Sequence, residues 1–576
     1  MPDLKAELDA CFDALKKEYD IELIDYIPDG DQQRKVNIPV WRIVLQATVE
    51  NRVEDVEVVM AFPLAFPYVM PWMFVTDSRF RMLPHISYKS CKLCIYEDGL
   101  VYDATRIRGI IRDNIKRTRQ WVERYANRDN TDEYAAEIKS YWSEQYDGEP
   151  ELDDHWILVG DIPTQSIELN VVGYSKIDYE DNGEFLECAV YADEDNPVAA
   201  YIRSNHKTAN SHVLFLSSLA IPSKPPYSLT PEQLIECIIT DDDKKLFRQF
   251  VNHNRKGYIL FPIGVKHMLG GVYIPKLEVK KKGFRKGSLS PYQVLMGFGN
   301  NGNHIQRLVT TQYEENRIAK RTAGTMMDER TFLIAGLGSI GSNLCYFMNG
   351  YNNAQFVLVD RDYLTTDNIG RHLLGFDSLG QKKALAVEHF LKSYRPDRQV
   401  QSEDKFIQNI DLAEINKASA LFVCTGDVMS EQWLLDRMTS DEVKVPVFIM
   451  WLEPYGVSGL MLYVNPSDKG CFSQLQTEAQ NGFLKYALIS NEEYEKGDKL
   501  MKSDAGCNGQ YALYSANDVT LFLSAMFPMI DSLLSNPTNT TCYRWVGNVE
   551  IAKRKGIVLS TDAEGLSKNA FQQLPL

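Results

Sequence analysis

A glycine-rich turn between an apolar run and a helical run is where the residue types of this sequence first suggest chemistry. The turn contains Gly336, Gly338 and Gly341. The first glycine permits a tight turn, the second lets the backbone approach a phosphate, and the third allows the following helix to pack closely on the strand. The N-terminus of that helix, expected over 342–348, offers unpaired N–H groups and a positive dipole end. The pattern predicts a phosphate-binding turn.

A second apolar strand, expected over 356–359, ends on Asp360, about twenty residues after the turn, where nucleotide-binding units place a ribose-binding carboxylate. Four polar or cationic residues follow in close succession: Asp362, Asn368, Arg371 and Lys383. A dehydrogenase would leave these groups unexplained. They favour a site that holds the negative charge of phosphates during a reaction.

The residues from Asp360 to Lys383 resemble the adenylation motif of the ubiquitin-activating and ThiF/MoeB superfamily, which reads D-x-D, then S/D-N-x-x-R, then G-x-x-K. The resemblance implies ATP as the nucleotide, Asp360 as the ribose ligand, and Asn368, Arg371 and Lys383 as phosphate contacts. Lys382 does not fit the G-x-x-K spacing. The implied reaction is attack of a protein C-terminal carboxylate on the α-phosphate of ATP, with pyrophosphate as the leaving group.

A further strand, expected over 420–424, is followed by Asp427. The resemblance makes Asp427 the magnesium-associated carboxylate, and a carboxylate beside phosphate oxygens suits Mg²⁺. ATP and Mg²⁺ are therefore the expected cofactors. Arg317 and Arg321 precede the glycine turn on an expected helix, at a place where relatives supply an arginine to ATP.

The first 125 residues carry the elements of a small α+β domain. We expect a helix near 4–19, strands near 21–27, 36–49, 53–62 and 73–75, and a helix over 104–125. This order, with a proline-rich turn and a histidine-containing loop, resembles a ubiquitin-conjugating enzyme domain. Leu93-Cys94-Ile95 matches the cysteine of that family, and Pro84-His85 matches the start of its H-P-N motif.

The resemblance implies that Cys94 carries an acyl group as a thioester, with Cys91 as the alternative thiol. Such a cysteine must be exposed enough to react as its thiolate. The asparagine of the family is missing, since His85 is followed by Ile86 and Ser87. Three groups are candidates for its oxyanion-stabilising role: Ser87, Asn114 and a backbone N–H.

Residues 149–315 contain β-rich runs and no motif, and by resemblance they take the place of a linker or of a degenerate activating-enzyme-like domain. We therefore predict an α/β and α+β multidomain chain with three parts. These are a ubiquitin-conjugating-like domain over 1–148, a mixed linker domain over 149–315, and a Rossmann-like ThiF adenylation domain over 316–576.

A polar stretch over about 465–506 is too long for an ordinary connection. Activating enzymes have a crossover loop here that guides the substrate tail. The stretch leads to Cys507, whose surroundings resemble the segment that bears the activating cysteine of ThiF-like proteins. Cys471, near the start of the stretch, is the alternative.

Composition limits the classes of function. A formal charge of −16 argues against a nucleic-acid binder, whose affinity rests on cationic side chains, although 276–286 is a basic cluster. The sequence shows neither a signal peptide nor a long apolar run, so we expect a cytoplasmic protein without a membrane partner. The ten cysteines are expected to be reduced thiols. Only Cys91 and Cys94 form a close pair, so a four-cysteine zinc site is not expected.

A conjugating-like domain, a linker and an adenylating domain in one chain resemble the bacterial fused activating and conjugating enzymes of CBASS antiphage operons. The resemblance implies an ATP-dependent transferase that adenylates the C-terminal tail of a cGAS/DncV-like nucleotidyltransferase. The tail would pass to Cys507, then to Cys94, and finally to an amine of a target protein. The resemblance also implies a homodimer.

Two other classes of protein share parts of the pattern. A NAD- or FAD-dependent Rossmann oxidoreductase would share the glycine turn and Asp360. A non-catalytic scaffold would bind the tail of a partner without turning over ATP.

Overall fold

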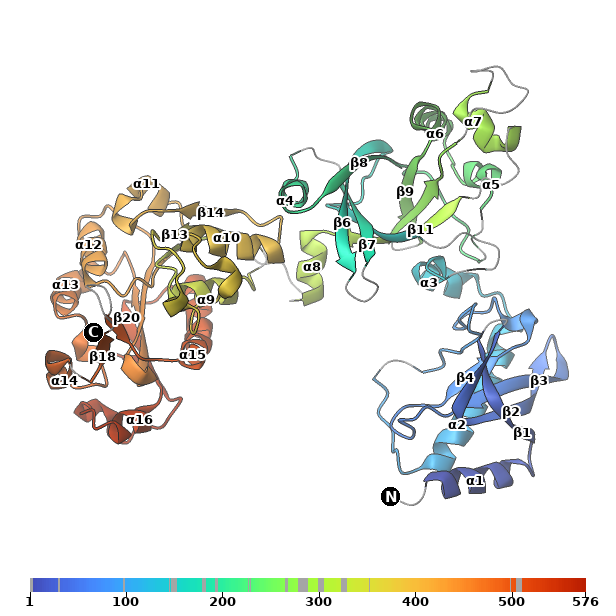
Figure 1. The fold of residues 1–576 in the computed structure, drawn as a ribbon, viewed down its shortest axis with the longest axis horizontal. Helices are drawn as coiled ribbons and strands as arrows, with labels where there is room; N and C mark the ends of the chain where they lie inside the picture. The colour runs from blue at the N-terminus through green and yellow to red at the C-terminus, as the bar shows by residue number, and fades with distance from the viewer. Residues whose placement is uncertain are drawn as a thin grey trace. The chain divides into compact units, whose positions relative to one another are not determined.

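The computed structural model divides into two compact units, Met1–Glu314 and Glu315–Leu576 (Figure 1). It describes residues 4–29, 32–96, 99–144, 146, 153–178, 183–191, 195–225, 227, 229–264, 268–277, 289–298, 305–322, 329–351, 353–497, 499–503 and 510–576.

The first unit begins with an antiparallel sheet, and two helices cover one of its faces. Its strands are β1 (Asp20–Asp29), β2 (Gln32–Val49), β3 (Arg52–Ala61) and β4 (Trp72–Val75), paired in chain order. The helices α1 (Leu4–Leu15) and α2 (Ile107–Tyr125) contribute Leu8 and Ile111 to the same core as Trp41 of β2. The predicted helix, four-stranded meander and closing helix are confirmed.

Helix α3 (Thr131–Trp142) connects this domain to a barrel. At its start, Tyr134 Oη donates to the carbonyl oxygen of Met82 (2.6 Å). At its end, Trp142 Nε1 donates to the carbonyl oxygen of Leu308 (3.1 Å). Lys139 reaches the carbonyl oxygen of Leu269 (2.8 Å), and burial lowers its pKa to about 8. The helix thus packs against both neighbours through satisfied polar groups.

The barrel is closed and mixed, in the order β10-β11-β5-β7-β6-β8-β9. Its strands are β5 (Asp153–Val159), β6 (Ile167–Asp178), β7 (Gly183–Tyr191), β8 (Thr208–Phe215), β9 (Gly257–Ile263), β10 (Met268–Ile274) and β11 (Gln306–Tyr313). Among the described residues, the α-helices α4 (Pro197–Asn205), α5 (Pro231–Glu236), α6 (Asp241–Asn254) and α7 (Pro291–Gln293) accompany it, and α7 continues into η2 (Val294–Phe298). The barrel contains both parallel pairs, such as β11 with β5 and β5 with β7, and antiparallel pairs, such as β6 with β7 and β10 with β11.

The second unit contains an eight-stranded sheet in the order β14-β13-β12-β15-β16-β17-β20-β21. The parallel strands are β12 (Arg330–Ala335), β13 (Ala354–Val359), β14 (Val400–Glu403), β15 (Ala420–Val423) and β16 (Val447–Leu452). The antiparallel strands are β17 (Ser458–Val464), β20 (Thr541–Val546) and β21 (Phe571–Leu574). The carboxyl ends of parallel strands share one edge, so the glycine turn, Asp360 and Asp427 lie along that edge.

Helices cover both faces of this sheet (Figure 1). On one face, α9 (Ser339–Met348), α10 (Lys383–Tyr394) and α15 (Ala516–Ser535) share a core that includes Leu344, Val387 and Phe522. On the other face, α12 (Val428–Thr439) and α13 (Phe472–Gln480) bury Leu434 and Leu475. By length and composition α15 could cross a membrane, but one face of this helix packs in the core described above.

The stretch expected to be a long polar connection contains ordered elements. After β17 come η7 (Lys469–Cys471), α13, η8 (Leu484–Tyr486), α14 (Asn491–Lys496) and β18 (Met501–Ser503), which pairs with β19 (Gln510–Ala512). The apolar residues Phe472, Phe483 and Tyr486 are buried against the sheet. Because such residues are sparse among polar ones, the sequence pattern alone did not reveal these short helices.

One buried carboxylate ties this crossover segment (465–503) to the sheet. Glu453, just after β16, accepts hydrogen bonds from the backbone N–H groups of Leu488 (2.9 Å) and Ile489 (3.0 Å). It also accepts from the hydroxyls of Tyr494 (3.0 Å) and Ser458. Each donor would lose a buried partner without this side chain.

We predict that Glu453→Gln lowers the free energy of unfolding by about 1–3 kcal/mol, because the amide cannot accept from all of these donors. Limited proteolysis of the full chain should then cut faster within 465–503. Glu492→Gln, an exposed carboxylate on α14, is the matched control and should leave the cleavage rate unchanged. Equal cleavage of both variants would contradict the role given to Glu453.

Candidate functional site

The glycine turn has the close packing that its sequence predicts. Gly336 has a φ of +84°, and a Cβ there would lie 2.7 Å from the backbone of Thr425. A Cβ on Gly341 would lie 1.9 Å from the carbonyl oxygen of Gly336. Gly338 has open space around it and caps α9. The turn therefore presents bare backbone and a helix N-terminus to any anion in front of it.

The peptide groups on either side of Leu337 are held by two side chains. Asp360 Oδ2 accepts from the N–H of Leu337 (2.6 Å), and its Oδ1 accepts from the N–H of Asp362 (2.8 Å). His372 Nε2 donates to the carbonyl oxygen of Leu337 (2.8 Å). These hydrogen bonds show that Asp360 positions the turn. Its role as the ribose ligand stays a prediction.

His372 was not singled out in the sequence, although it directly follows Arg371. Its Nδ1 accepts from the N–H of Leu374 (3.0 Å), so Nε2 carries the proton. Burial lowers the pKa of His372 to about 4, which keeps the ring neutral. Its position in the D-x-D to G-x-x-K stretch was the one available signal.

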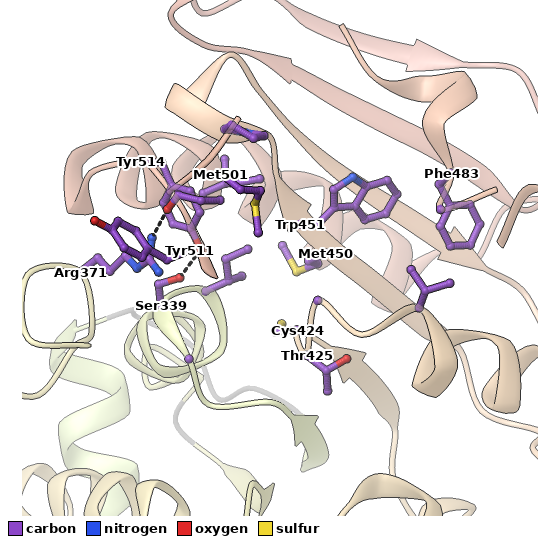
Figure 2. Close-up of a pocket in the computed structure, with 18 of the residues that line it drawn as sticks. Ser339, Arg371, Cys424, Thr425, Met450, Trp451, Phe483, Met501, Tyr511 and Tyr514 are labelled. Carbon is purple, nitrogen blue, oxygen red and sulfur yellow. Dashed lines mark hydrogen bonds between the residues drawn. The ribbon is translucent and has the colours of Figure 1, made fainter. Parts of the chain in front are cut away.

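Arg371 and its neighbours form one wall of a cavity of about 530 Å³ (Figure 2). Arg371 donates to the carbonyl oxygen of Ala512 (2.7 Å), and its guanidinium lies 4.5 Å from the ring centroid of Tyr514. The hydroxyls of Tyr514 and Ser339 are 2.7 Å apart. Asn368 lines the same wall. A cation, hydroxyls and an amide therefore face the cavity beside the glycine turn.

Lys383 forms an ion pair with Asp362. It is the first residue of α10, it is buried, and its Nζ lies 3.3 Å from Asp362 Oδ2. Lys382 points elsewhere, since its Nζ lies 3.0 Å from Asp404 and donates to the carbonyl oxygen of Arg361 (2.8 Å). The fold thus brings together Asp362 and Lys383, two residues that the sequence analysis singled out separately.

Asp427 caps α12. Its carboxylate accepts from the N–H groups of Met429 (3.3 Å) and Ser430 (3.2 Å) and from the hydroxyl of Ser430 (2.6 Å). One turn later, Glu431 lines the cavity, and burial together with the charge of Asp427 raises its pKa to about 7. The carboxylate of Asp427 fits Mg²⁺, which takes one or two protein oxygens beside phosphates and waters. Sequence reasoning missed Glu431 because nothing local signals its burial.

Of the two candidate thiols for the first thioester, Cys507 and Cys471, the structure describes Cys471 alone. Cys507 lies outside the described residues. Cys471 is half-buried and its Sγ lies 3.0 Å from the carbonyl oxygen of Asp468. Burial raises the pKa of Cys471, which disfavours its thiolate.

In the first unit, Cys94 is exposed and Cys91 is 1% exposed. The Sγ of Cys91 accepts from Arg81 Nε (3.4 Å) inside the core. The N–H of Cys94 donates to the carbonyl oxygen of His85 (2.8 Å), which holds the cysteine loop against the histidine loop. Of the two thiols, only Cys94 lies where an acyl group could reach it.

The structure also distinguishes between the residues that could replace the missing asparagine. Asn114 is fully buried and donates to the carbonyl oxygen of Ile110 (2.9 Å), so it faces the core. Ser87 is half-buried, with its hydroxyl 3.5 Å from Glu144. The ring of His85 lies 3.5 Å from Glu137 of α3. Ser87 and a backbone N–H remain as candidates.

Two family models match the chain. Residues 319–525 match the ThiF family, and residues 31–149 match the prokaryotic E2 family B. The predicted resemblance to an adenylating domain joined to a ubiquitin-conjugating-like domain is therefore confirmed.

One curated relative is the ATP-dependent ubiquitin transferase-like protein Cap2 of Pseudomonas aeruginosa (strain BWHPSA011 / Pa011). It is 26% identical over 192 residues, which are 33% of this chain and 33% of that protein, so the match spans about a third of the relative's length.

Two solved structures are similar to part of the chain. The crystal structure of PaaA has a TM-score of 0.28 at 14% identity, over 38% of this chain and 69% of that one. The crystal structure of E. coli MccB with succinimide has a TM-score of 0.27 at 12% identity, over 40% of this chain and 62% of that one. These scores are too low to support a functional inference.

We predict a pH dependence of stability that comes from His372. Its folded pKa of about 4 lies below the ordinary value of 6.5, so the unfolded chain binds more protons between these values. The stabilisation is complete above the higher value and is lost as the pH falls. Lowering the pH from 7.5 to 5 should cost about 2 kcal/mol through this group.

Urea denaturation of the full chain at both pH values measures the effect. His372→Gln should lose this part of the pH dependence. His253→Gln, at an exposed position on α6, should keep it. A His372→Gln variant with an unchanged pH dependence would show that the histidine does not titrate as argued.

Proposed function

With a ThiF family domain and a prokaryotic E2 family B domain in one chain, we propose that the protein is an ATP-dependent ubiquitin transferase-like enzyme. It adenylates the C-terminal carboxylate of a partner protein, carries the acyl group on cysteine thiols, and conjugates it to an amine. The cavity beside the glycine turn, lined by Gly338, Asn368 and Arg371, carries this proposal.

In the first step, an oxygen of the partner's carboxylate attacks the α-phosphorus of ATP. The bond from that phosphorus to the bridging oxygen breaks, pyrophosphate leaves, and an acyl adenylate remains. Negative charge spreads over the phosphate oxygens as this happens. Gly338, the N-terminus of α9 and Arg371 face the space where those oxygens would lie.

Preorganised donors and cations lower the barrier of such a step because they need no reorganisation as charge develops. The Arg371 guanidinium is held by Ala512 and Tyr514 before any substrate arrives. Lys383 is held by Asp362 in the same way. A Mg²⁺ ion held by Asp427 would add neutralising charge on the phosphates.

In the later steps, a thiolate attacks the acyl carbon and AMP leaves, giving a thioester. We assign this first thiol to Cys507, with Cys471 as the alternative. A second thiolate, Cys94, takes the acyl group by thiol exchange. The amine of the target then attacks, the Cys94 thiolate leaves, and an amide forms with release of a proton. The exposure of Cys94 supports its part in this sequence.

The finer parts of the proposal follow from the resemblance to CBASS enzymes. The acyl donor is the C-terminal tail of a cGAS/DncV-like nucleotidyltransferase, and the setting is cytoplasmic antiphage defence by a homodimer. The relative named as an ATP-dependent ubiquitin transferase-like protein supports the transferase activity in this proposal. Both matched families favour it over a NAD- or FAD-dependent oxidoreductase and over a scaffold that binds a tail without using ATP.

We predict that Arg371→Ala and Lys383→Ala each lower tail-dependent exchange of labelled pyrophosphate into ATP by about a hundredfold or more, because each removes a preorganised cation. Lys382→Ala is the matched control. This neighbouring lysine pairs with Asp404, so its loss should change the rate by less than about threefold. Exchange that survives in both test variants would refute the adenylation site.

We also predict which thiols carry the acyl group. Non-reducing gels with labelled partner should show that Cys507→Ala abolishes every thioester, whereas Cys94→Ala keeps the first and loses the second. Cys91→Ala controls for the neighbouring buried thiol and should keep both. Equal labelling of the Cys94→Ala and native chains would exclude Cys94 as a carrier.

A further inference from the structure

Glu431 is a buried carboxylate that the adenylation step above does not require. It lies on the first turn of α12, it is 5% exposed, and it lines the cavity. Within the described part of the chain, its carboxylate makes no recorded hydrogen bond or ion pair. A carboxylate so placed has lost most of its water without gaining a protein donor.

Glu431 shares the cavity with apolar and aromatic side chains, and, beyond the effect of burial, Asp427 is near enough for its charge to raise the pKa of Glu431. Burial raises the pKa of the Cys424 thiol, and the nearby charge of Glu431 raises it further. The start of α12 touches the crossover segment, since a Cβ on Gly482 would lie 4.0 Å from Val428. The next residue, Phe483, stacks on Trp451 with ring centroids 5.4 Å apart. Both rings line the same cavity as Glu431.

This end of the cavity lies away from the phosphate-binding wall. Figure 2 shows Arg371, Ser339 and Tyr514 on one side and Trp451 and Phe483 on the other. Cys424 and Thr425 lie between the two groups. A tail whose terminal carboxylate reacts beside Arg371 would therefore place residues upstream of its terminus toward the aromatic end.

A ligand that carries a cation would neutralise the charge of Glu431, which has no recorded cationic partner in the described residues. A guanidinium or ammonium group can pair with a desolvated carboxylate and can also lie on an aromatic face. A neutral apolar group would fill the space but leave the carboxylate unpaired. An anionic group would add repulsion in a region of low dielectric.

We propose that the aromatic end of the cavity binds a basic side chain, arginine or lysine, located upstream of the terminal residue of the acyl-donor tail. Glu431 is the carboxylate partner of that side chain, and Trp451 and Phe483 form the surface on which it lies. The inference rests on the proposed function, because it assigns the tail to this cavity. It makes Glu431 a specificity-determining residue for the class of tail that is activated.

Short synthetic peptides with a free C-terminal carboxylate test this inference. Each peptide carries one arginine at a successive upstream position, and a matched peptide carries norleucine there. The readout is exchange of labelled pyrophosphate into ATP by the full chain. The native chain should prefer arginine at one position by about tenfold or more, as expected for one buried ion pair.

Glu431→Gln keeps the shape of the side chain and removes its charge, so the preference for arginine should fall to near one. Trp451→Leu, which removes the aromatic surface, should also reduce the preference and serves if Glu431→Gln fails to fold. Glu414→Gln is the matched control, because this carboxylate on α11 (Leu412–Ile415) is exposed and pairs with Lys417. It should retain the native preference.

The outcomes separate this inference from the proposed function. Exchange without any preference for arginine, or a preference that survives Glu431→Gln, would overturn the inference and leave adenylation standing. Weaker ATP binding by Glu431→Gln with an unchanged peptide preference would place Glu431 against the nucleotide and also overturn it. No exchange by the native chain with any peptide would count against adenylation itself.

Discussion

The two peptide groups that flank Leu337 are the constraint on which the candidate site depends. Asp360, at the end of β13, accepts from the N–H of this residue, and His372 donates to its carbonyl oxygen. Both side chains come from the stretch after the second strand, so the motif that follows the turn also positions it. With the turn held, Gly338 and the N-terminus of α9 face the cavity. Loss of either hydrogen bond would leave a buried backbone group unpaired.

Two parts of the fold line the cavity. The carboxyl ends of the parallel strands supply one side, as open α/β sheets generally do. The crossover segment supplies the other through Phe483 and Leu484, and Glu453 holds that segment to the sheet. A buried charge with four donors is therefore structural, whereas Glu431, buried beside apolar surfaces without a recorded donor in the described chain, is available to a ligand. The contrast between these two glutamates separates a role in folding from a role in recognition.

The sequence determined the order of elements and most of the nucleotide-binding pattern. Strands, turns and helices follow from local periodicity and from glycines, which are required where a Cβ would collide with backbone, as at Gly341. The motif from Asp360 to Lys383 also lies within one short stretch, so its spacing could be read directly. In the first domain, the meander and its closing helix were evident because β-branched alternation and helical periodicity are local signals.

Only the tertiary structure decided which side chains are buried, exposed or paired. Cys91 and Cys94 are close in sequence, yet one lies in the core and the other at the surface. Asn114 is a candidate for the oxyanion-stabilising role from the sequence, but in the structure it is buried. Glu453 accepts a hydrogen bond from Leu488 only because the chain folds back onto the sheet. The physical reason is that desolvation and hydrogen bonding depend on residues that are distant in sequence. Spacing can reveal a motif, but only packing decides whether a polar group is satisfied or open to a ligand.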